Sequence, residues 1–405
     1  MIYNFPLSKT YQIPINRIDK LTDNNLVLSS INNEFIICEI GINYLDLQRN
    51  PNNAEMYNSL FQYKGYITRF RELKLAYNYA YGLKNLGNTA YLNAGLQCII
   101  HCDYLSEYFL SDSFKHEYDL YFSKYKKTAS GFSNAYSNFL KKGVADVASL
   151  RSSFVRLKPK FDNKNQNDSP EFIIDFLNEL SSNLNLARLY PDVEESLYDT
   201  YEDRKWKKYI RKEHSIIQDL FYGMISTNHT CSNCNSSSKS YEVFLSLNLP
   251  IVKNDCTLED CLEKQFFGSA KVAKCSKCGK ESKFSCNSTI SHAPYYLIVL
   301  FKRFKRDKLF IQKNSGLVVY NQFLNIKRFI SSPNDNGQYE LICVNMHHGS
   351  LVSGHYTAEC KVKNEWLNFD DTTVNNAKFS AHSSAYLLIY KKCSAPPANV
   401  QNNDE

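Results

Sequence analysis

The chain has 405 residues, of which 43% are hydrophobic, and its Lys and Arg residues outnumber Asp and Glu by 7. This length and composition can bury one large core or two to three smaller ones. The longest apolar run, YYLIVLF at 295–301, is far shorter than the ~20 residues that cross a bilayer, so we expect no membrane protein. The mild positive charge is dispersed, which argues against a nucleic-acid-binding surface.

The opening residues MIYNFPLSKTYQ contain no basic segment followed by an apolar one. We therefore expect no signal peptide and a cytoplasmic or nuclear protein. In such a long chain, the thirteen cysteines are more simply reduced thiols or metal ligands than disulfides.

Residues 1–80 form an N-terminal accessory segment whose role the sequence does not specify. The run at 25–47 is β-branched and strand-like, whereas 53–80 carries apolar and aromatic residues at helical spacing. We treat this segment as a candidate contact for regulatory subunits.

The region from 82 to 200 is predicted to be mainly helical. Residues 168–184, DSPEFIIDFLNELSSNL, form an amphipathic pattern with Asp168 or Ser169 as the N-cap. Pro170 falls in the first turn, where its missing N–H costs nothing. Residues 190–214 are highly charged and are predicted to be a solvated connection.

From residue 215 onward the pattern changes to short β-branched or aromatic segments bounded by polar turns. The predicted strands are 246–252, 295–304, 339–346, 354–362, 365–370 and 385–392. Helices followed by antiparallel strands indicate an α+β fold. The polar tail at 393–405 is predicted to be frayed.

Two CxxC pairs, Cys231/Cys234 and Cys275/Cys278, are separated by 40 residues and lie in tight polar turns. Gly279 follows the second pair and can adopt the positive φ that such a turn needs. Four thiolates in this pattern can complete a tetrahedral Zn²⁺ site of the structural kind. We predict a zinc ion there that supplies local folding free energy.

The stretch GHYTAECKVKNEWLNFDD is typical of a β-hairpin that turns near Lys363-Asn364. In that register Asp370 lies one diagonal step from His355, and Asp371 points to the other face. Such a carboxylate can orient and charge-stabilise the imidazole, as in a nucleophile–base–acid triad. A register slip by one residue would exchange the two aspartates. An isolated His and Asp on a hairpin are also common as surface residues.

The stretch GLKNLGNTAYLNAGLQ, 82–97, is a glycine-containing turn that leads into a predicted helix. A thiol at position 90 would have its pKa lowered by the helix dipole and free N–H groups. The same amides, with Asn85, could stabilise an oxyanion. Position 90 is nevertheless Ala90, and Cys98 lies about 12 Å further along the helix. Gly354 leaves room for a substrate backbone beside His355.

Several blocks of the sequence, in this order, resemble the ubiquitin-specific protease family of cysteine deubiquitinases. The stretch 82–97 resembles the family's cysteine box with Ala90 at the cysteine, and QNDSPEF and YLIVLFKRF resemble two further blocks. The segments between 339 and 390 resemble the histidine box. The resemblance implies a papain-like catalytic domain at 81–392. Its thumb would span about 82–215, its fingers about 216–295 and its palm about 296–392.

The resemblance also implies the chemistry, which is thiol-dependent cleavage of the isopeptide bond after the C-terminal glycine of ubiquitin. His355 would be the general base, Asp370 its partner, and Asn85 the oxyanion donor assisted by Asp371. Asp168 would pair with basic groups of the ubiquitin tail. The implied substrate-binding residues are Gln97, Asp168, Glu171, Gly354 and Tyr356. The implied zinc ligands are Cys231, Cys234, Cys275 and Cys278.

Ala90 leaves several interpretations open. A deubiquitinase whose cysteine was replaced would keep the rest of its site, and here Asn85, His355 and Asp370 remain. A natural pseudo-deubiquitinase, acting as a ubiquitin-binding adaptor or scaffold, should tend to lose these parts too. In both cases the chain should bind ubiquitin without cleaving it. A zinc-containing nucleic-acid module would leave the hairpin and the glycine turn unexplained.

Overall fold

The computed structural model describes the strands at 15–22, 25–30 and 35–39 and, further along the chain, a set of ranges that begins at residue 80. These ranges are 80–110, 114–115, 118–119, 130–142, 147–162, 165–185, 199–306, 311–333, 335–350 and 354–393. The chain divides into two compact units, Met1–Asn78 with Arg188–Glu195 and Tyr79–Ala187 with Ser196–Glu405. The helical pattern expected at 53–80 and the frayed tail expected at 393–405 lie, apart from residues 80 and 393, outside the described residues.

The smaller unit contains a three-stranded antiparallel sheet in the order β1-β2-β3. Its strands are β1 (Ile15–Thr22), β2 (Asn25–Ser30) and β3 (Phe35–Glu39). The strand-like pattern expected within 25–47 is therefore confirmed for β2 and β3.

Most helices of the larger unit precede its strands. They are α3 (Ala90–Ile100), α4 (Asp103–Leu110), α6 (Ser130–Lys142), α7 (Val147–Leu157), α8 (Ser169–Asn183), α9 (Tyr201–Ile210), α10 (Ile216–Phe221) and, later, α11 (Leu258–Phe266), with 3-10 turns η2 (Pro159–Phe161) and η3 (Lys327–Phe329). Every residue of α3 is buried, because α8 packs on this helix and it also contacts β15, β16 and β17 of the central sheet described below. None of the described helices combines the length and the apolar character needed to span a bilayer.

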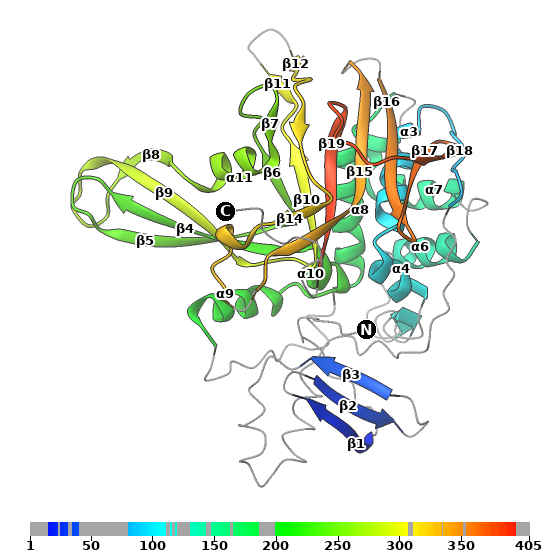
Figure 1. The fold of residues 1–405 in the computed structure, drawn as a ribbon, viewed down its shortest axis with the longest axis horizontal. Coiled ribbons are helices and arrows are strands. Elements are labelled where there is room, and N and C mark those ends of the chain that lie inside the picture. The colour runs from blue at the N-terminus through cyan, green and yellow to red at the C-terminus, as the bar shows by residue number, and fades with distance from the viewer. Residues whose placement is uncertain are drawn as a thin grey trace, which may run out of the picture. The chain divides into compact units, whose positions relative to one another are not determined.

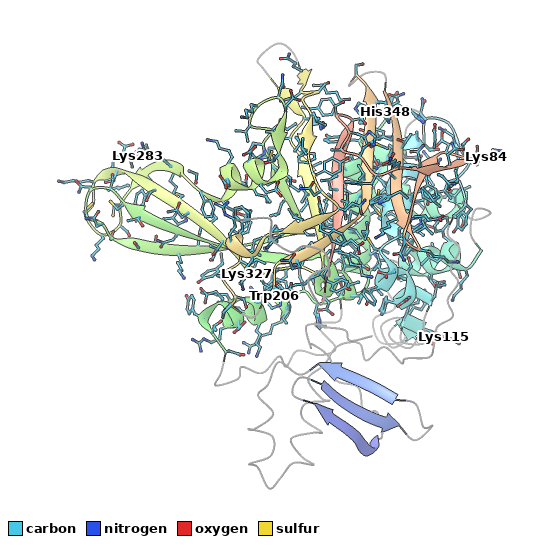
Figure 2. All side chains as sticks on the ribbon, in the orientation of Figure 1. Lys84, Lys115, Trp206, Lys283, Lys327 and His348 are labelled. Carbon is cyan, nitrogen blue, oxygen red and sulfur yellow. The ribbon has the colours of Figure 1, made fainter. Side chains whose placement is uncertain are left out.

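The structure corrects the expectation that 190–214 is a solvated connection, since α9 lies within it. Thr200 and Asp203 form a capping box at the start of α9. Trp206, labelled in Figure 2, is buried, and its ring stacks on that of His292 with centroids 3.9 Å apart. The charged side chains concealed an amphipathic helix because Trp206 and Ile210 are its only buried residues.

An eight-stranded sheet forms the centre of the larger unit, in the order β18-β17-β16-β15-β19-β10-β6 with β14 beside β15 (Figure 1). Its strands are β6 (Ser246–Leu249), β10 (Tyr296–Phe301), β14 (Phe323–Asn325), β15 (Gln338–Gly349), β16 (Gly354–Val362), β17 (Glu365–Asp370), β18 (Thr373–Ala377) and β19 (Ala385–Lys392). Only β6 and β10 pair in parallel. These strands follow the helices in sequence and are mainly antiparallel, so the predicted α+β class is confirmed.

A four-stranded sheet in the order β5-β4-β9-β8 extends away from α3, α6 and α8 (Figure 1). Its strands are β4 (Gly223–Cys231), β5 (Ser237–Phe244), β8 (Ser269–Lys274) and β9 (Glu281–His292). None of the four was among the predicted strands. β5 and β8 are largely exposed and polar, which removes the alternation of buried and exposed residues. β9 was missed although its first residues do alternate between exposed and buried positions. Two small sheets pair β7 (Cys256–Thr257) with β13 (Val318–Val319) and β11 (Phe304–Arg306) with β12 (Ile311–Lys313).

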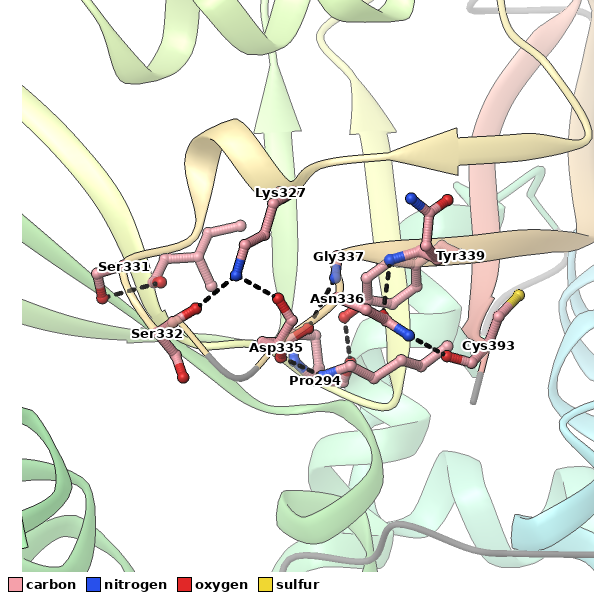
Figure 3. Close-up of polar contacts among 12 residues, drawn as sticks. Pro294, Lys327, Ser331, Ser332, Asp335, Asn336, Gly337, Tyr339 and Cys393 are labelled. Carbon is pink, nitrogen blue, oxygen red and sulfur yellow. Dashed lines mark hydrogen bonds and ion pairs between the residues drawn. The ribbon is translucent and has the colours of Figure 1, made fainter. Parts of the chain in front are cut away.

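Lys327 fastens the loop between η3 and β15. Its ammonium group donates to the carbonyl oxygens of Ser332 and Asp335 at 2.9 and 2.6 Å (Figure 3). It also donates to that of Pro333 at 2.8 Å. The Asp335 carboxylate in turn pairs with Lys392 of β19. These contacts join the loop to the central sheet and give three of its carbonyl groups a hydrogen-bond donor.

Candidate active site and metal centre

Position 90 begins helix α3, and side-chain hydrogen bonds fix the loop before it. Asn85 Oδ1 accepts from the backbone N–H groups of Gly87 and Thr89 at 2.9 and 3.2 Å. Thr89 Oγ1 accepts from the N–H of Leu86 at 2.8 Å. Gly87 has a φ of 103°, which glycine adopts without steric cost. The loop therefore reaches the helix in a defined conformation, with Ala90 as the first helical residue.

Asp371 ties this loop to the strand hairpin. Its Oδ2 accepts from Asn85 Nδ2 at 2.9 Å, and its Oδ1 accepts from Asn93 Nδ2 at 2.8 Å. Its carbonyl oxygen accepts from the N–H of Leu83 at 2.7 Å. A Cβ on Gly82 would lie 2.5 Å from that oxygen, so the chains can approach this closely only at a glycine. Asp371 thus holds the loop, the helix and the hairpin together.

Asn93 is a site residue that the sequence analysis missed. It is buried in α3, close to one turn beyond Ala90, and its amide also donates to the carbonyl oxygen of Leu83 at 3.2 Å. The available signal was a polar residue within an otherwise apolar helix, because a buried amide is retained where it finds partners.

His355 and Asp370 form a hydrogen-bonded pair at the start of β16 and the end of β17. The two strands pair in the predicted register, with Val362 opposite Glu365, and His355 Nε2 lies 2.6 Å from Asp370 Oδ1. The side chains are 42% and 47% exposed. Because Nε2 is hydrogen-bonded to Asp370, Nδ1 is the nitrogen of His355 that can accept a proton from a group in the adjoining cleft.

Ala90 and His355 line the same cleft, whose volume is about 50 Å³. The other lining residues are Asn85, Asn88, Tyr91, Gln166, Asn167, Gly354 and Tyr356. The nucleophile position, the expected base and the expected oxyanion donor therefore lie together, although they come from a loop, a helix and a strand far apart in sequence. Such an arrangement suits covalent acyl transfer by a group at position 90.

The space that the sequence analysis assigned to a substrate backbone at Gly354 is partly taken by His347. A Cβ on Gly354 would lie 2.2 Å from His347 Nε2. The Gly354 N–H donates to Gln166 Oε1 at 2.9 Å. His347 is 4% exposed and its Nδ1 lies 2.9 Å from Lys313 Nζ. Burial, and then the Lys313 charge, lower the pKa of His347 to about 4, so its ring accepts from the lysine as the neutral form.

Asp168, expected to meet basic groups of a substrate, is also the N-cap of α8. Its Oδ1 accepts from the N–H of Glu171 at 2.8 Å, and its Oδ2 accepts from the Tyr356 hydroxyl at 3.2 Å. Burial raises the pKa of Asp168. The Glu171 carboxylate pairs with Lys160 at 2.6 Å. Asp168 and Tyr356 thus form one unit at the cleft, whereas Glu171 is engaged by a lysine of the same chain.

Gln97 does not lie where the substrate-binding expectation requires. It is 1% exposed, and its Nε2 donates to the carbonyl oxygen of Tyr81 at 2.9 Å. A side chain enclosed within α3 and its neighbours cannot reach a substrate, so this expectation is wrong. Gln97 instead fastens the segment before the glycine turn to the helix.

The four cysteines of the CxxC pairs meet at the outer end of the four-stranded sheet, near Lys283 in Figure 2. Their sulfur atoms all lie within 4.8 Å of one another, and those of Cys234 and Cys275 are 3.8 Å apart. Sulfurs bound tetrahedrally at a Zn–S distance of ~2.3 Å are about 3.8 Å apart. The set can therefore hold a zinc ion: Cys231, Cys234, Cys275 and Cys278.

Both CxxC pairs use the same backbone turn. Asn235 and Gly279, which directly follow the pairs, have φ values of 54° and 71°, so the prediction for Gly279 is confirmed. The N–H of each donates at 2.9 Å to the carbonyl oxygen of the first cysteine of its pair. Backbone N–H groups of Cys278 and Lys277 lower the pKa of Cys275 to about 6, which favours the thiolate that a metal requires.

Comparisons with known proteins agree with this geometry. The family model described as "Ubiquitin carboxyl-terminal hydrolase" (UCH) matches residues 81–390. Ubiquitin carboxyl-terminal hydrolase 2 of Bos taurus is 31% identical over 337 residues, which cover 78% of this chain and 55% of the relative. The Homo sapiens protein of the same name is 30% identical over 340 residues, covering 78% and 55%. The chain thus spans about half the length of these curated relatives, and 34% of Drosophila melanogaster Usp2.

Solved structures show the same fold. The SAGA Ubp8/Sgf11/Sus1/Sgf73 DUB module bound to ubiquitin aldehyde matches with a TM-score of 0.61 at 20% identity, covering 91% of this chain and 79% of that chain. The module with a Cys-to-Ala variant of Ubp8, bound to monoubiquitin, gives 0.59 at 20% identity with the same coverage. The fold is therefore the fingers–palm–thumb arrangement that the sequence resemblance implied. Together with the family match, this similarity shows that the chain belongs to the ubiquitin carboxyl-terminal hydrolase family, as a protein of the ubiquitin-specific protease type.

Proposed function

We propose that residues 81–392 form a catalytic domain that binds ubiquitin. With cysteine at position 90, it would cleave the isopeptide bond after the C-terminal glycine of ubiquitin. The observation that carries this proposal is the single cleft shared by Ala90, Asn85 and the His355–Asp370 pair. The names of the curated relatives, which are ubiquitin carboxyl-terminal hydrolases, support the same reaction class.

A cysteine at position 90 would be the nucleophile. Its thiol would stand at the N-terminus of α3, where the helix dipole and free N–H groups lower a thiol pKa. His355 Nδ1 takes the thiol proton, while Asp370 holds the ring through Nε2 and stabilises the imidazolium. The thiolate attacks the carbonyl carbon of the last ubiquitin glycine, and His355 returns the proton to the leaving amine. Water, with His355 as base, then releases ubiquitin from the acyl-enzyme.

Asn85 stabilises the oxyanion of the tetrahedral intermediate. One hydrogen of its Nδ2 is bonded to Asp371 at 2.9 Å, which fixes the direction of the amide. The second hydrogen and the N–H groups at the start of α3 are the donors for the developing negative charge. Asp371 acts here as a positioning residue through Asn85, rather than by contact with the substrate.

The chain with Ala90 should not cleave the isopeptide bond, because alanine presents a methyl group where the nucleophilic thiol is needed. Loss of a triad nucleophile costs on the order of 10⁶ in kcat. Binding does not require the sulfur, since the surrounding contacts of Asn85, Asp371 and His355 are intact without it. The complex of a Cys-to-Ala variant of Ubp8 with monoubiquitin supports this separation of binding from cleavage.

A second candidate function is that of a natural pseudo-deubiquitinase that serves as a ubiquitin-binding adaptor or scaffold. Ala90 itself is the observation that favours it. The intact His355–Asp370 pair and the Asp371 contacts with Asn85 and Asn93 favour a disarmed enzyme instead. A lineage released from catalysis has no need to keep these contacts.

We also propose a structural Zn²⁺ on the four cysteines of the CxxC pairs and an intracellular protein of the cytoplasm or nucleus. Zinc would supply folding free energy to the outer end of the four-stranded sheet and no catalytic chemistry. The Ubp8 structures contain the partner subunits Sgf11, Sus1 and Sgf73, which supports a contact between residues 1–80 and regulatory subunits in this protein.

The test of ubiquitin binding uses the chain as it stands. Full-length ubiquitin and ubiquitin lacking its last two glycines are titrated by calorimetry against the zinc-loaded protein. We expect saturable binding of the intact form with a Kd well below ~100 μM, and weaker binding of the truncated form because the tail no longer reaches the cleft. Undetectable binding of both forms at ~100 μM would contradict the proposal.

A further inference from the structure

A second group of cysteines takes no part in the proposed reaction. Cys98 of α3, Cys343 of β15 and Cys360 of β16 are each fully buried. Their sulfur atoms lie within 4.8 Å of one another. All three are free thiols. Apart from the zinc set, no other all-cysteine group among the described residues meets this criterion.

The sheet register and α3 create this cluster together. Cys343 and Cys360 are direct cross-strand partners in the β15–β16 ladder. The Cys343 thiol lies 3.6 Å from the carbonyl oxygen of Cys98. Cys98 belongs to α3, and this helix packs on both β15 and β16. Residues directly opposite in a ladder keep their side chains adjacent without any backbone movement. The three sulfurs therefore approach one another as a consequence of the fold.

A buried polar group adjoins the thiols. Asn345 lies two positions from Cys343, on the same face of β15, and is fully buried. Its Nδ2 donates to Ser169 Oγ at 2.9 Å, but its Oδ1 has no hydrogen-bond partner in the part of the chain that the structure describes. An unsatisfied buried acceptor is costly, which marks this region as one that gains from an additional polar or cationic occupant.

The number of sulfurs distinguishes this cluster from the zinc set. Structural zinc is almost always four-coordinate, as the four cysteines of the CxxC pairs allow. No fourth sulfur among the described residues lies within 4.8 Å of all three, so these thiolates suit a soft ion that accepts three ligands. Soft sulfur ligands select Cu(I). The spread of up to 4.8 Å requires only a small contraction to bring three sulfurs around one ion.

We propose that Cys98, Cys343 and Cys360 bind one Cu(I) ion in a buried trigonal thiolate site. Each sulfur that becomes a ligand releases its thiol proton to solvent, so the affinity rises with pH. The ion links α3, which begins at Ala90, to β16, which carries His355. Copper would thus join the two elements of the proposed active site. The site is independent of ubiquitin, so its test does not rest on the proposed function.

The test titrates Cu(I), held by a chromogenic competing chelator under anaerobic conditions, into the zinc-loaded chain. Bound copper and retained zinc are counted by mass spectrometry of the desalted protein. Ala90 makes this chain suitable, because no thiol stands at the nucleophile position to compete for copper. We expect one copper per chain with no loss of zinc, and an X-ray absorption spectrum with three sulfur neighbours.

Variants decide which cysteines are responsible. Cys343→Ala should abolish this equivalent of copper, and Cys360→Ala provides the same test if the first variant fails to fold. Cys256→Ala is the matched control, since it removes another fully buried thiol, 3.6 Å from Cys261, outside the cluster. Copper uptake unchanged by Cys343→Ala and Cys360→Ala, or copper bound only in exchange for zinc, would overturn the proposal.

Discussion

Asp371 is the residue on which the geometry of the proposed site most depends. Its carboxylate accepts from Asn85 and Asn93, which are separated from it by 286 and 278 positions. In an Ala90→Cys background, Asp371→Ala should lower kcat for a fluorogenic ubiquitin amide by about 10- to 100-fold, because Asn85 loses its orientation. It should also reduce the free energy of unfolding by about 1–3 kcal/mol, because the buried Asn93 amide loses its hydrogen bond to a carboxylate. The exposed Asp162→Ala is the control, and equal activity of the two variants would contradict this role.

His347 should make folding stability sensitive to acid. Its pKa is about 4 in the folded chain and ordinarily ~6.5 when unfolded. Between these values the unfolded chain binds more protons, so stability rises with pH and is lost as the pH falls from ~6.5 toward 4. The contribution is at most about 1.4 kcal/mol per pH unit. Urea midpoints should depend less on pH in His347→Gln than in the unchanged chain. Equal pH dependence in His347→Gln would refute this assignment.

For individual residues, the sequence predicted a role correctly where that role depends on neighbouring residues in the chain. It failed where the role depends on which side of a helix is buried. The CxxC pairs and Gly279 were predictable because a metal turn needs particular residues at fixed spacing. Gln97 was misassigned and Asn93 was missed because their roles depend on distant partners, Tyr81 and Asp371. A sequence shows that an amide is present in a helix, but not which side of the helix is enclosed.

The β15–β16 pair is an element whose close approach can be tested by adding one methyl group. Gly354→Ala places a Cβ 2.2 Å from His347 Nε2 and 2.9 Å from the His348 carbonyl oxygen. The strand must shift, so we expect a loss of about 1–3 kcal/mol of stability. Gly131→Ala in α6 is the matched control, because nothing lies within 4 Å of its added Cβ and alanine favours helix by up to ~1 kcal/mol. Equal thermal midpoints for the two variants would contradict the contact.

The four-stranded sheet should depend locally on zinc. Removing the metal leaves four thiols at the end of a largely exposed sheet, so amide hydrogen exchange in β4 and β9 should accelerate more than in β10 and β19. Cys278→Ser should reproduce this change and lose the zinc. Cys286→Ala, which removes a buried thiol from β9 outside the set, should retain both zinc and protection. Protection that is unaffected by chelation would exclude a structural metal.

Elements with a strong local pattern were predictable, and the others were not. The β16–β17 hairpin was placed in register because Lys363 and Asn364 form a two-residue turn with φ values of 51° and 78°. The amphipathic helix α8 was identified with Asp168 as its cap. The exposed strands β5 and β8 lack a buried face, and the sequence signal for a strand depends on that face.

For the whole molecule, the proposed site exists because the fold brings together the two ends of the region that matches the family model, residues 81–390. The approach of Gly82 to Asp371 and the bond from Asn85 to Asp371 connect the helical and strand portions. Neither contact can be derived from the spacing of hydrophobic residues. The family resemblance, in contrast, implied that the loop before Ala90 and the end of the hairpin belong to one site. The family and the fold were therefore predictable from the sequence, but the contacts that orient the site required the structure.

The most direct test of the central claim restores the thiol. Ala90→Cys and the unchanged chain are compared, both zinc-loaded, with a fluorogenic ubiquitin amide and with a ubiquitin probe that carries a thiol-reactive end. We predict that Ala90→Cys cleaves the amide and forms a covalent adduct with the probe. The unchanged chain should still bind ubiquitin, but its rate of amide cleavage should be lower by on the order of 10⁶. A folded Ala90→Cys protein that binds ubiquitin but neither cleaves nor labels would contradict an intact catalytic site and leave ubiquitin binding as the function.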